Sequence, residues 1–113
     1  MLVVLRFAVA EPAEEFVAQA HEAIGALAAR PGYRSGTLAR AYDDPSLWCL
    51  AMEWDSVGSY RRALSHYDVK LRGTPLLARA VPEASAFEPL ASAGPGGPVN
   101  TASSDRAEIP SRP

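Results

Sequence analysis

The stretch Tyr33–Asp55, which reads YRSGTLARAYDDPSLWCLAMEWD, predicts two β-strands joined by a tight turn. Its two strand-forming runs, 33–42 and 47–55, flank Asp43-Asp44-Pro45-Ser46, a composition typical of turns. A hairpin closed by these four residues places Tyr42 opposite Leu47. That register sets small residues opposite large ones, which fills one sheet face without voids: Ala41 with Trp48, Ala39 with Leu50, Thr37 with Met52, and Ser35 with Trp54.

This register predicts two unlike sheet faces once the apolar strand at 2–9 is added. The bulky face carries Trp48, Leu50, Met52 and Trp54, with Val3, Leu5, Phe7 and Val9 from the first strand. The second face carries Leu2, Val4, Arg6, Ala8, Leu38, Arg40, Cys49 and Glu53. Such a second face is too apolar to be left in water and too charged for a simple core.

Helical patterns flank these strands. An amphipathic helix begins at Glu11-Pro12, carries an apolar stripe from Ala13 to Ala28, and stops at Pro31-Gly32. A second helix, capped by Asp55 or Ser56, ends at Gly73 and carries the stripe Val57, Tyr60, Leu64, Tyr67 and Leu71. A short helix from Thr74-Pro75 and a last edge strand within 84–90 complete the pattern.

The order of these elements predicts an α+β, ferredoxin-like fold, β-α-β-β-α-β. Its four-stranded antiparallel sheet has two helices on one face. This domain spans 1–90. Of the 23 residues from 91 to 113, 15 are Ala, Gly, Pro or Ser, so we expect a disordered tail there.

Composition excludes several classes of protein. Eleven Lys and Arg against 13 Asp and Glu give a net charge of -2, without the basic excess that nucleic-acid binding needs. The single cysteine, Cys49, rules out an intrachain disulfide and fits a buried, inert thiol. The apolar run at 2–10 is too short to span a membrane and contains Arg6. We therefore expect no membrane association and a cytoplasmic location.

The second sheet face predicts a homodimer. A second copy of the same face would cover it, with Arg6, Arg34 or Arg40 paired to Glu53. The alternative is a half-exposed antiparallel face with a few surface ion pairs.

Four motifs occur in a specific order within 1–90: Pro31-Gly32-Tyr33-Arg34-Ser35-Gly36; Asp43-Asp44-Pro45; Glu53-Trp54-Asp55-Ser56 followed by Tyr60-Arg61-Arg62-Ala63-Leu64; and Ala84-Ser85-Ala86-Phe87-Glu88. In this order and spacing they resemble the antibiotic biosynthesis monooxygenase family. The resemblance implies a dimeric α/β barrel, in which two sheets pack face to face. It also implies a ligand cavity between the helices and the sheet of each subunit.

The resemblance leaves the chemistry open, because fold does not fix function. Some members of that family oxygenate aromatic polyketides to quinones without metal or flavin, and others open haem. The haem-opening pattern has Asn on the first strand, Trp in the second helix and a ligating His about ten residues later. Here Leu5, Ala63 and Gly73 or Thr74 occupy those places. Haem degradation is therefore disfavoured, and we expect no cofactor.

Candidate substrate-binding residues are the aromatic and apolar side chains expected between the helices and the bulky face: Phe7, Trp48, Trp54, Tyr60, Leu64 and Tyr67. Candidate catalytic groups on the second helix are Tyr60, Tyr67 and Arg61. The competing interpretation is that these aromatics form the core and that Arg61 lies on the surface. His21 and His66 lack metal-ligand spacing and are expected at a boundary and on the surface, so no metal site is predicted.

The sequence thus favours a cofactor-independent monooxygenase that uses O₂ on a small aromatic or phenolic, polyketide-like compound. Two alternatives stay open. One is a non-catalytic module that binds a small ligand or is associated with stress. The other is an isomerase that moves protons in its ligand without oxygen.

Overall fold

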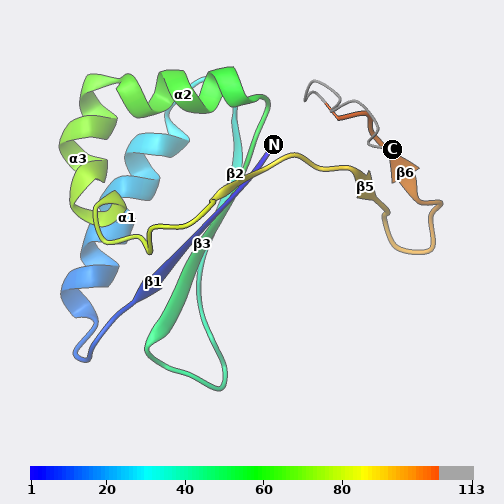
Figure 1. The fold of residues 1–113 in the computed structure, drawn as a ribbon. Coiled ribbons are helices and arrows are strands. Elements are labelled where there is room, and N and C mark those ends of the chain that lie inside the picture. Colours follow the sequence, from blue (N-terminus) through cyan, green and yellow to red (C-terminus); the bar gives the residue numbers. More distant parts are fainter. Residues whose placement is uncertain (105–113) are drawn as a thin grey trace, which may run out of the picture.

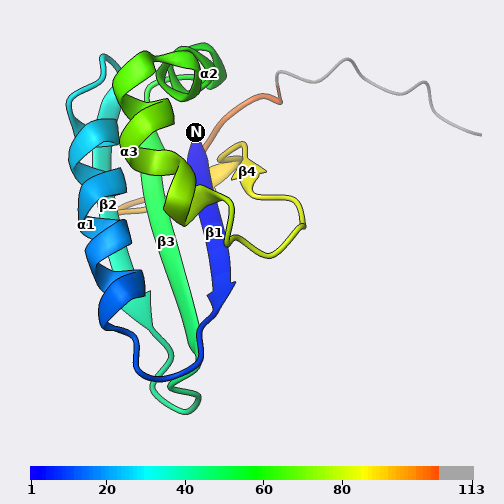
Figure 2. The same ribbon diagram turned by 90° about the vertical axis from the view of Figure 1, so that its left-hand side faces the viewer.

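Residues 1–104 are described here in a computed structural model, and they form a four-stranded antiparallel sheet with helices on one face (Figures 1 and 2). The strand order is β2-β3-β1-β4. The elements are β1 (Leu2–Ala8), α1 (Glu14–Ala28), β2 (Tyr33–Arg40), β3 (Leu47–Trp54), α2 (Val57–Ser65), α3 (Tyr67–Leu77), β4 (Ala86–Phe87), β5 (Ala91–Ser92) and β6 (Asn100–Thr101). The predicted α+β, ferredoxin-like fold class is confirmed.

The predicted register of the β2–β3 hairpin is wrong by one residue. The observed pairs are Arg40 with Trp48, Ala39 with Cys49, Leu38 with Leu50, Thr37 with Ala51, and Gly36 with Met52. The loop holds five residues rather than four, because the Ala41 amide donates to the Leu47 carbonyl at 2.8 Å. The Asp44 carboxylate shapes this loop by accepting hydrogen bonds from the Ser46 hydroxyl and amide at 2.7 and 3.1 Å.

This slip moves β2 side chains to the opposite face, because strand side chains alternate with period two. Leu38 and Arg40, expected on the second face, lie on the helix-covered face, where Leu38 packs against the core and Arg40 covers the Trp48 ring. The uncovered face, called here the open face, therefore differs from the expected one. It comprises Leu2, Val4, Arg6, Ala8, Ser35, Thr37, Ala39, Leu47, Cys49, Ala51, Glu53 and Phe87.

Two arginines near the open face have carboxylate partners within the chain. Arg6 donates two hydrogen bonds of 2.8 Å to the Glu83 carboxylate. Arg34 pairs with Asp55 at 2.9 Å. A β-bulge between Tyr33 and Ser35 accompanies this arrangement.

The core lies between the sheet and the helices. Val3, Leu5 and Phe7 of β1, and Val9 just after it, are at most 8% exposed, as expected for one buried face. Phe16 of α1 packs edge to face on Phe7 and Trp48, with ring centroids 5.1 and 5.3 Å apart. Helix α1 also buries Leu27 and three small residues, Ala20, Ala23 and Ala26, and the small residues let it approach the sheet and α3 closely.

The single long second helix expected from Val57 to Gly73 is wrong, because the helix breaks at His66. The Ser65 hydroxyl bonds to the Arg61 and Arg62 carbonyls at the end of α2, and His66 has extended backbone dihedrals. His66 then caps α3, its Nδ1 accepting from the Asp68 amide at 3.1 Å. Helix α3 runs through Gly73 and Pro75 and turns Val69, Gly73 and Leu76 into the core.

The last strand is much shorter than 84–90, since only Ala86 and Phe87 pair with β1. Part of the segment expected to be disordered forms the small β5–β6 hairpin, and 105–113 lie outside the described residues. Residues 89–104, called here the arm, are all exposed. The arm extends away from the sheet on the side opposite the helices (Figure 1).

Gly32 is the position where the backbone most needs a glycine. Its φ is +90°, and a Cβ there would lie 2.4 Å from the Ser59 Cβ. Ser59 is buried and completes the capping box of α2 with Ser56, so it cannot move freely. The Gly32 turn therefore fixes how α2 begins next to β2.

Gly32→Ala is expected to lower the free energy of unfolding by about 2–4 kcal/mol, from left-handed strain and the clash with Ser59. Gly94→Ala is the matched control, because nothing lies within 4 Å of the added Cβ. Urea unfolding at one fixed protein concentration measures both. Equal midpoints for the two variants would contradict this account of the turn.

Candidate functional site

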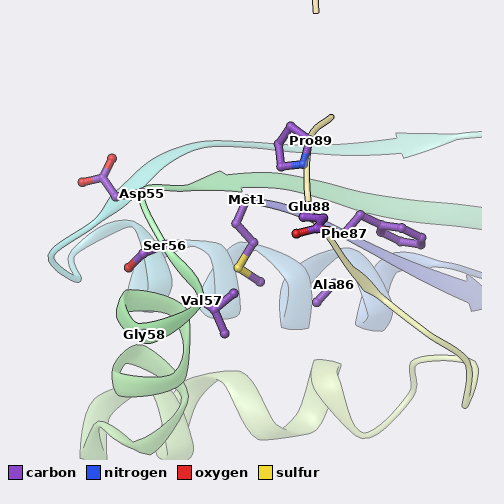
Figure 3. Close-up of a pocket in the computed structure, with 9 residues that line it drawn as sticks. All are labelled: Met1, Asp55, Ser56, Val57, Gly58, Ala86, Phe87, Glu88 and Pro89. Carbon is purple, nitrogen blue, oxygen red and sulfur yellow. The ribbon is translucent and has the colours of Figure 1, made fainter. Parts of the chain in front are cut away.

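The candidate site is a cleft of about 570 Å³ where the start of α2 faces the end of β4. One wall is formed by Asp55 and Ser56, which link β3 to α2, and by Val57 and Gly58, which begin α2. The other wall is formed by Ala86, Phe87, Glu88 and Pro89. Met1 lies between the two walls (Figure 3). The cleft therefore lies where the start of α2, the start of β1 and the end of β4 meet.

Short elements create this cleft. Because β4 pairs with β1 for only two residues, the sheet edge ends beside the first turn of α2. Ala86 is opposite Val3 and so faces the helices, which leaves a small side chain where a larger one would fill the space. The Met1 ammonium donates to the Trp54 carbonyl at 2.9 Å and holds the thioether between Val57 and Ala86 (Figure 3).

The cleft is mostly apolar and has two carboxylates at its walls. Asp55 is already paired with Arg34 at 2.9 Å. Glu88 is half-buried and accepts a hydrogen bond from the Ser104 hydroxyl. An apolar space with a carboxylate at its rim can hold a flat, hydrophobic molecule and accept a proton from it.

Most of the predicted substrate-binding residues belong to the core. Phe7 and Trp54 are 0% and 1% exposed, and neither lines the cleft. Tyr60 is 9% exposed and packs on Trp54, with ring centroids 5.4 Å apart. Leu64 is half-buried against the same core. These four side chains support the helix–sheet packing behind the cleft.

The other predicted site residues do not gather at the cleft. Tyr67, at the start of α3, is 75% exposed, because the break at His66 turns it away from the stripe of α2. Arg61 is exposed on α2. Trp48 lies at the far end of β3, where it lines a different groove. The structure thus brings Trp54 and Tyr60 together and separates Trp48 and Tyr67 from them.

The sequence analysis missed the residues that line the cleft. Met1, Val57 and Ala86 carry no distinctive chemistry, and their proximity depends on where β4 ends. Pro89 was the available signal, because proline ends strand pairing. A strand that stops early beside a helix start is the feature that could have predicted the cleft.

The two histidines and the single cysteine lie outside the cleft. His21 is exposed on α1, and His66 serves as a helix cap. Cys49 is half-buried on the open face. Within 1–104, no group of three or more His, Cys, Asp or Glu side chains is arranged to hold a metal ion. Over the same residues, every helix is too short or too polar to cross a lipid bilayer.

Known proteins resemble this chain in structure. SnoaB, a cofactor-independent oxygenase from Streptomyces nogalater, is 24% identical, with a TM-score of 0.63 over 97% of this chain and 96% of SnoaB. A conserved protein from Methanosarcina mazei is 20% identical, with a TM-score of 0.62 over 75% of this chain and 84% of its own.

A protein named antibiotic biosynthesis monooxygenase is 14% identical, with a TM-score of 0.59 over 76% of this chain and 92% of its own. No protein-family model matches the sequence, and no curated protein matches it. At these identities the likeness establishes the fold. The chain has the fold of the antibiotic biosynthesis monooxygenases.

Burial raises the pKa of the Tyr60 hydroxyl above its ordinary value of 10.0, because the neutral phenol tolerates the core better than the phenolate. The contribution of this hydroxyl to the free energy of unfolding is therefore fully present below the unfolded pKa of 10.0. It is lost as the pH rises through the higher pKa of the folded chain. We expect Tyr60→Phe to lose less stability than the unsubstituted protein between pH 8 and about 11.

Urea midpoints at several pH values test this expectation. Tyr42→Phe is the control, because Tyr42 lies fully exposed in the hairpin loop. If Tyr60→Phe and the unsubstituted protein weaken in parallel with pH, the hydroxyl is not held in an apolar environment.

Proposed function

We propose that this chain is a homodimeric monooxygenase that oxidises a small aromatic or phenolic, polyketide-like compound with O₂, without metal or flavin. The observation that carries the proposal is the apolar cleft with a rim carboxylate, in a fold that extends over nearly all of both this chain and the cofactor-independent oxygenase SnoaB.

In such a reaction the substrate itself supplies the electrons. For a methylene activated by a neighbouring phenol, as in an anthrone, the overall change is R₂CH₂ + O₂ → R₂C=O + H₂O. Loss of one proton gives a carbanion that reduces O₂, and the new C–O bond gives a hydroperoxide. Loss of the second C–H proton and cleavage of the O–O bond then release water. The protein has to bind the substrate, accept the first proton and limit the access of water.

The cleft residues fit the first two of these tasks. Val57, Ala86 and the Met1 thioether offer apolar surface to a flat ring system. We assign proton acceptance to Glu88, whose half-buried carboxylate lies at the wall of the cleft beside Ala86 and Phe87. Tyr60, from the predicted catalytic set, supports the core behind the cleft.

The open face supports a dimer through the sheet. Leu2 is 37% exposed there, and the rest of the face is rich in small apolar residues: Val4, Ala8, Ala39, Cys49 and Ala51. Small side chains make a flat surface that a second sheet can approach to about 10 Å. The arm extends on this side of the sheet and exposes Leu90 and Val99 (Figure 1). A two-fold partner on the open face would cover both apolar surfaces.

A non-catalytic ligand-binding module is the second candidate, and one observation favours it. Tyr67 and Arg61, the candidate groups for handling a phenolic proton, are exposed and do not line the cleft. In that case the cleft would bind its ligand without consuming it.

The activity test measures O₂ uptake by the unsubstituted protein and by a variant whose cleft is filled by a larger side chain. An anthrone-type phenol in metal-free buffer should give one O₂ consumed per substrate oxidised. Ala86→Trp, which places a large ring between β4 and α2, should lower kcat/KM about tenfold or more, a barrier change of about 1.4 kcal/mol or more. Ala84→Trp is the control, because Ala84 is exposed and does not line the cleft.

Glu88→Gln separates the two candidate functions, because it should retain binding and lose turnover. Tight binding of the phenols with no O₂ uptake by the unsubstituted protein would instead identify a binding module. Equal activity in Ala86→Trp and Ala84→Trp would show that the cleft is not the reaction site.

The test of the dimer measures the oligomeric state after a charged side chain is substituted on the open face. Ala51→Arg should convert the dimer to a monomer at micromolar concentration, because it buries an unpaired charge at the centre of the sheet. Ala28→Arg, on the exposed side of α1, should remain dimeric. Sedimentation velocity measures both. A monomeric unsubstituted protein, or a dimeric Ala51→Arg, would reject this interface.

A further inference from the structure

A second groove, of about 610 Å³, lies at the other end of the sheet from the cleft. It is formed between the first half of α1 and the β2–β3 hairpin, and its side chains include Glu11, Glu14, Val17, His21, Arg40 and Trp48. Trp48 and Asp55 are seven residues apart on an extended strand, which corresponds to about 23 Å. The groove and the cleft are therefore separate sites.

Arg40 is held in this groove by an aromatic ring. Its guanidinium carbon lies 5.3 Å from the centroid of the Trp48 ring. Stacking uses the flat face of a guanidinium and leaves its N–H edge free for a carboxylate. Within 1–104, Arg40 has no salt bridge, whereas Arg6, Arg34 and Arg72 each pair with a carboxylate.

Negative charge lines the same groove from the helix side. Glu14 is in the first turn of α1 and Glu11 comes just before the helix, and neither forms a salt bridge within 1–104. His21 is two turns further along the same helix face, about 10 Å from Glu14. Val17 lies between these polar ends and supplies an apolar wall.

We propose that this groove binds a small zwitterion, most simply a free amino acid with an apolar or aromatic side chain. The ligand carboxylate would pair with the edge of the Arg40 guanidinium. Its ammonium would pair with Glu14 or Glu11, and its side chain would lie along Val17 and the Trp48 wall. Arg40 and the two glutamates line opposite walls of an apolar groove and form no salt bridge with each other. A ligand that carries both charges could pair with both walls at once.

Simpler ligands fit less well. An anion would meet two glutamates, and a cation would meet Arg40. Within 1–104 no set of ligating side chains is arranged for a metal ion. Only a ligand with both signs of charge satisfies both walls.

The proposal does not depend on the proposed reaction or on the dimer interface. Arg40 and Trp48 lie on the helix-covered side of the sheet, so a partner on the open face leaves the groove accessible. The corrected register is what places Arg40 here, since the predicted register put it on the opposite face.

The test uses three probes of equal ring size on the full chain. L-phenylalanine carries both charges, 3-phenylpropionate carries only the carboxylate, and 2-phenylethylamine carries only the ammonium. Calorimetric titration should give at least tenfold tighter binding for L-phenylalanine than for either analogue, because each analogue leaves the charges of one wall without a partner. The Trp48 indole N–H resonance should shift during the titration.

Substitutions of Arg40 and of the two glutamates test whether each wall of the groove binds the ligand. Arg40→Gln, and separately the double variant Glu11→Gln/Glu14→Gln, should each weaken L-phenylalanine binding about tenfold or more. Arg62→Gln, on the exposed face of α2, and the cleft-filling Ala86→Trp should leave it unchanged.

Three results would overturn the proposal. The first is no binding of L-phenylalanine at 10 mM. The second is binding of 3-phenylpropionate or 2-phenylethylamine as tight as that of L-phenylalanine. The third is loss of L-phenylalanine binding in Ala86→Trp, which would place the ligand in the cleft.

Discussion

The pairing register of β2 on β3 is the constraint on which the rest of the structure depends. It is set by the five-residue loop that the Asp44 carboxylate organises through Ser46. Because strand side chains alternate, this register decides which residues face the helices and which face outward. It packs the partly buried Leu38 against the core, places Arg40 over the Trp48 ring, and leaves small residues such as Ala39 and Ala51 on the open face.

The fold class followed from the sequence because its signals are strong and local. A nearly continuous apolar run, broken only by Arg6, marked β1, and the capped stripe from Val57 marked α2. The register did not follow, because one residue more or less in a loop changes the sequence signal little and the side-chain positions completely. The break at His66 was also missed, since histidine is not a usual cap and its role depends on the Asp68 amide.

The candidate site was predictable only in its general place, between the second helix and the sheet. Trp54 and Tyr60 were expected as aromatic walls, and they pack against each other in the core. The cleft instead depends on the short pairing of Ala86 and Phe87 with β1. Small residues that line a cavity because a strand ends there have no sequence motif. Aromatic residues are readily chosen as candidate site residues from sequence, even where they pack in the core.

The most direct test of the account is the origin of the oxygen atom in the product. Turnover of an anthrone-type phenol under ¹⁸O₂, in metal-free buffer with unlabelled water, should give a product that carries one ¹⁸O atom. The second labelled atom should appear in water. A product whose oxygen comes from the solvent, or recovery of the unchanged phenol after saturating binding, would contradict the claim that the chain is an oxygenase.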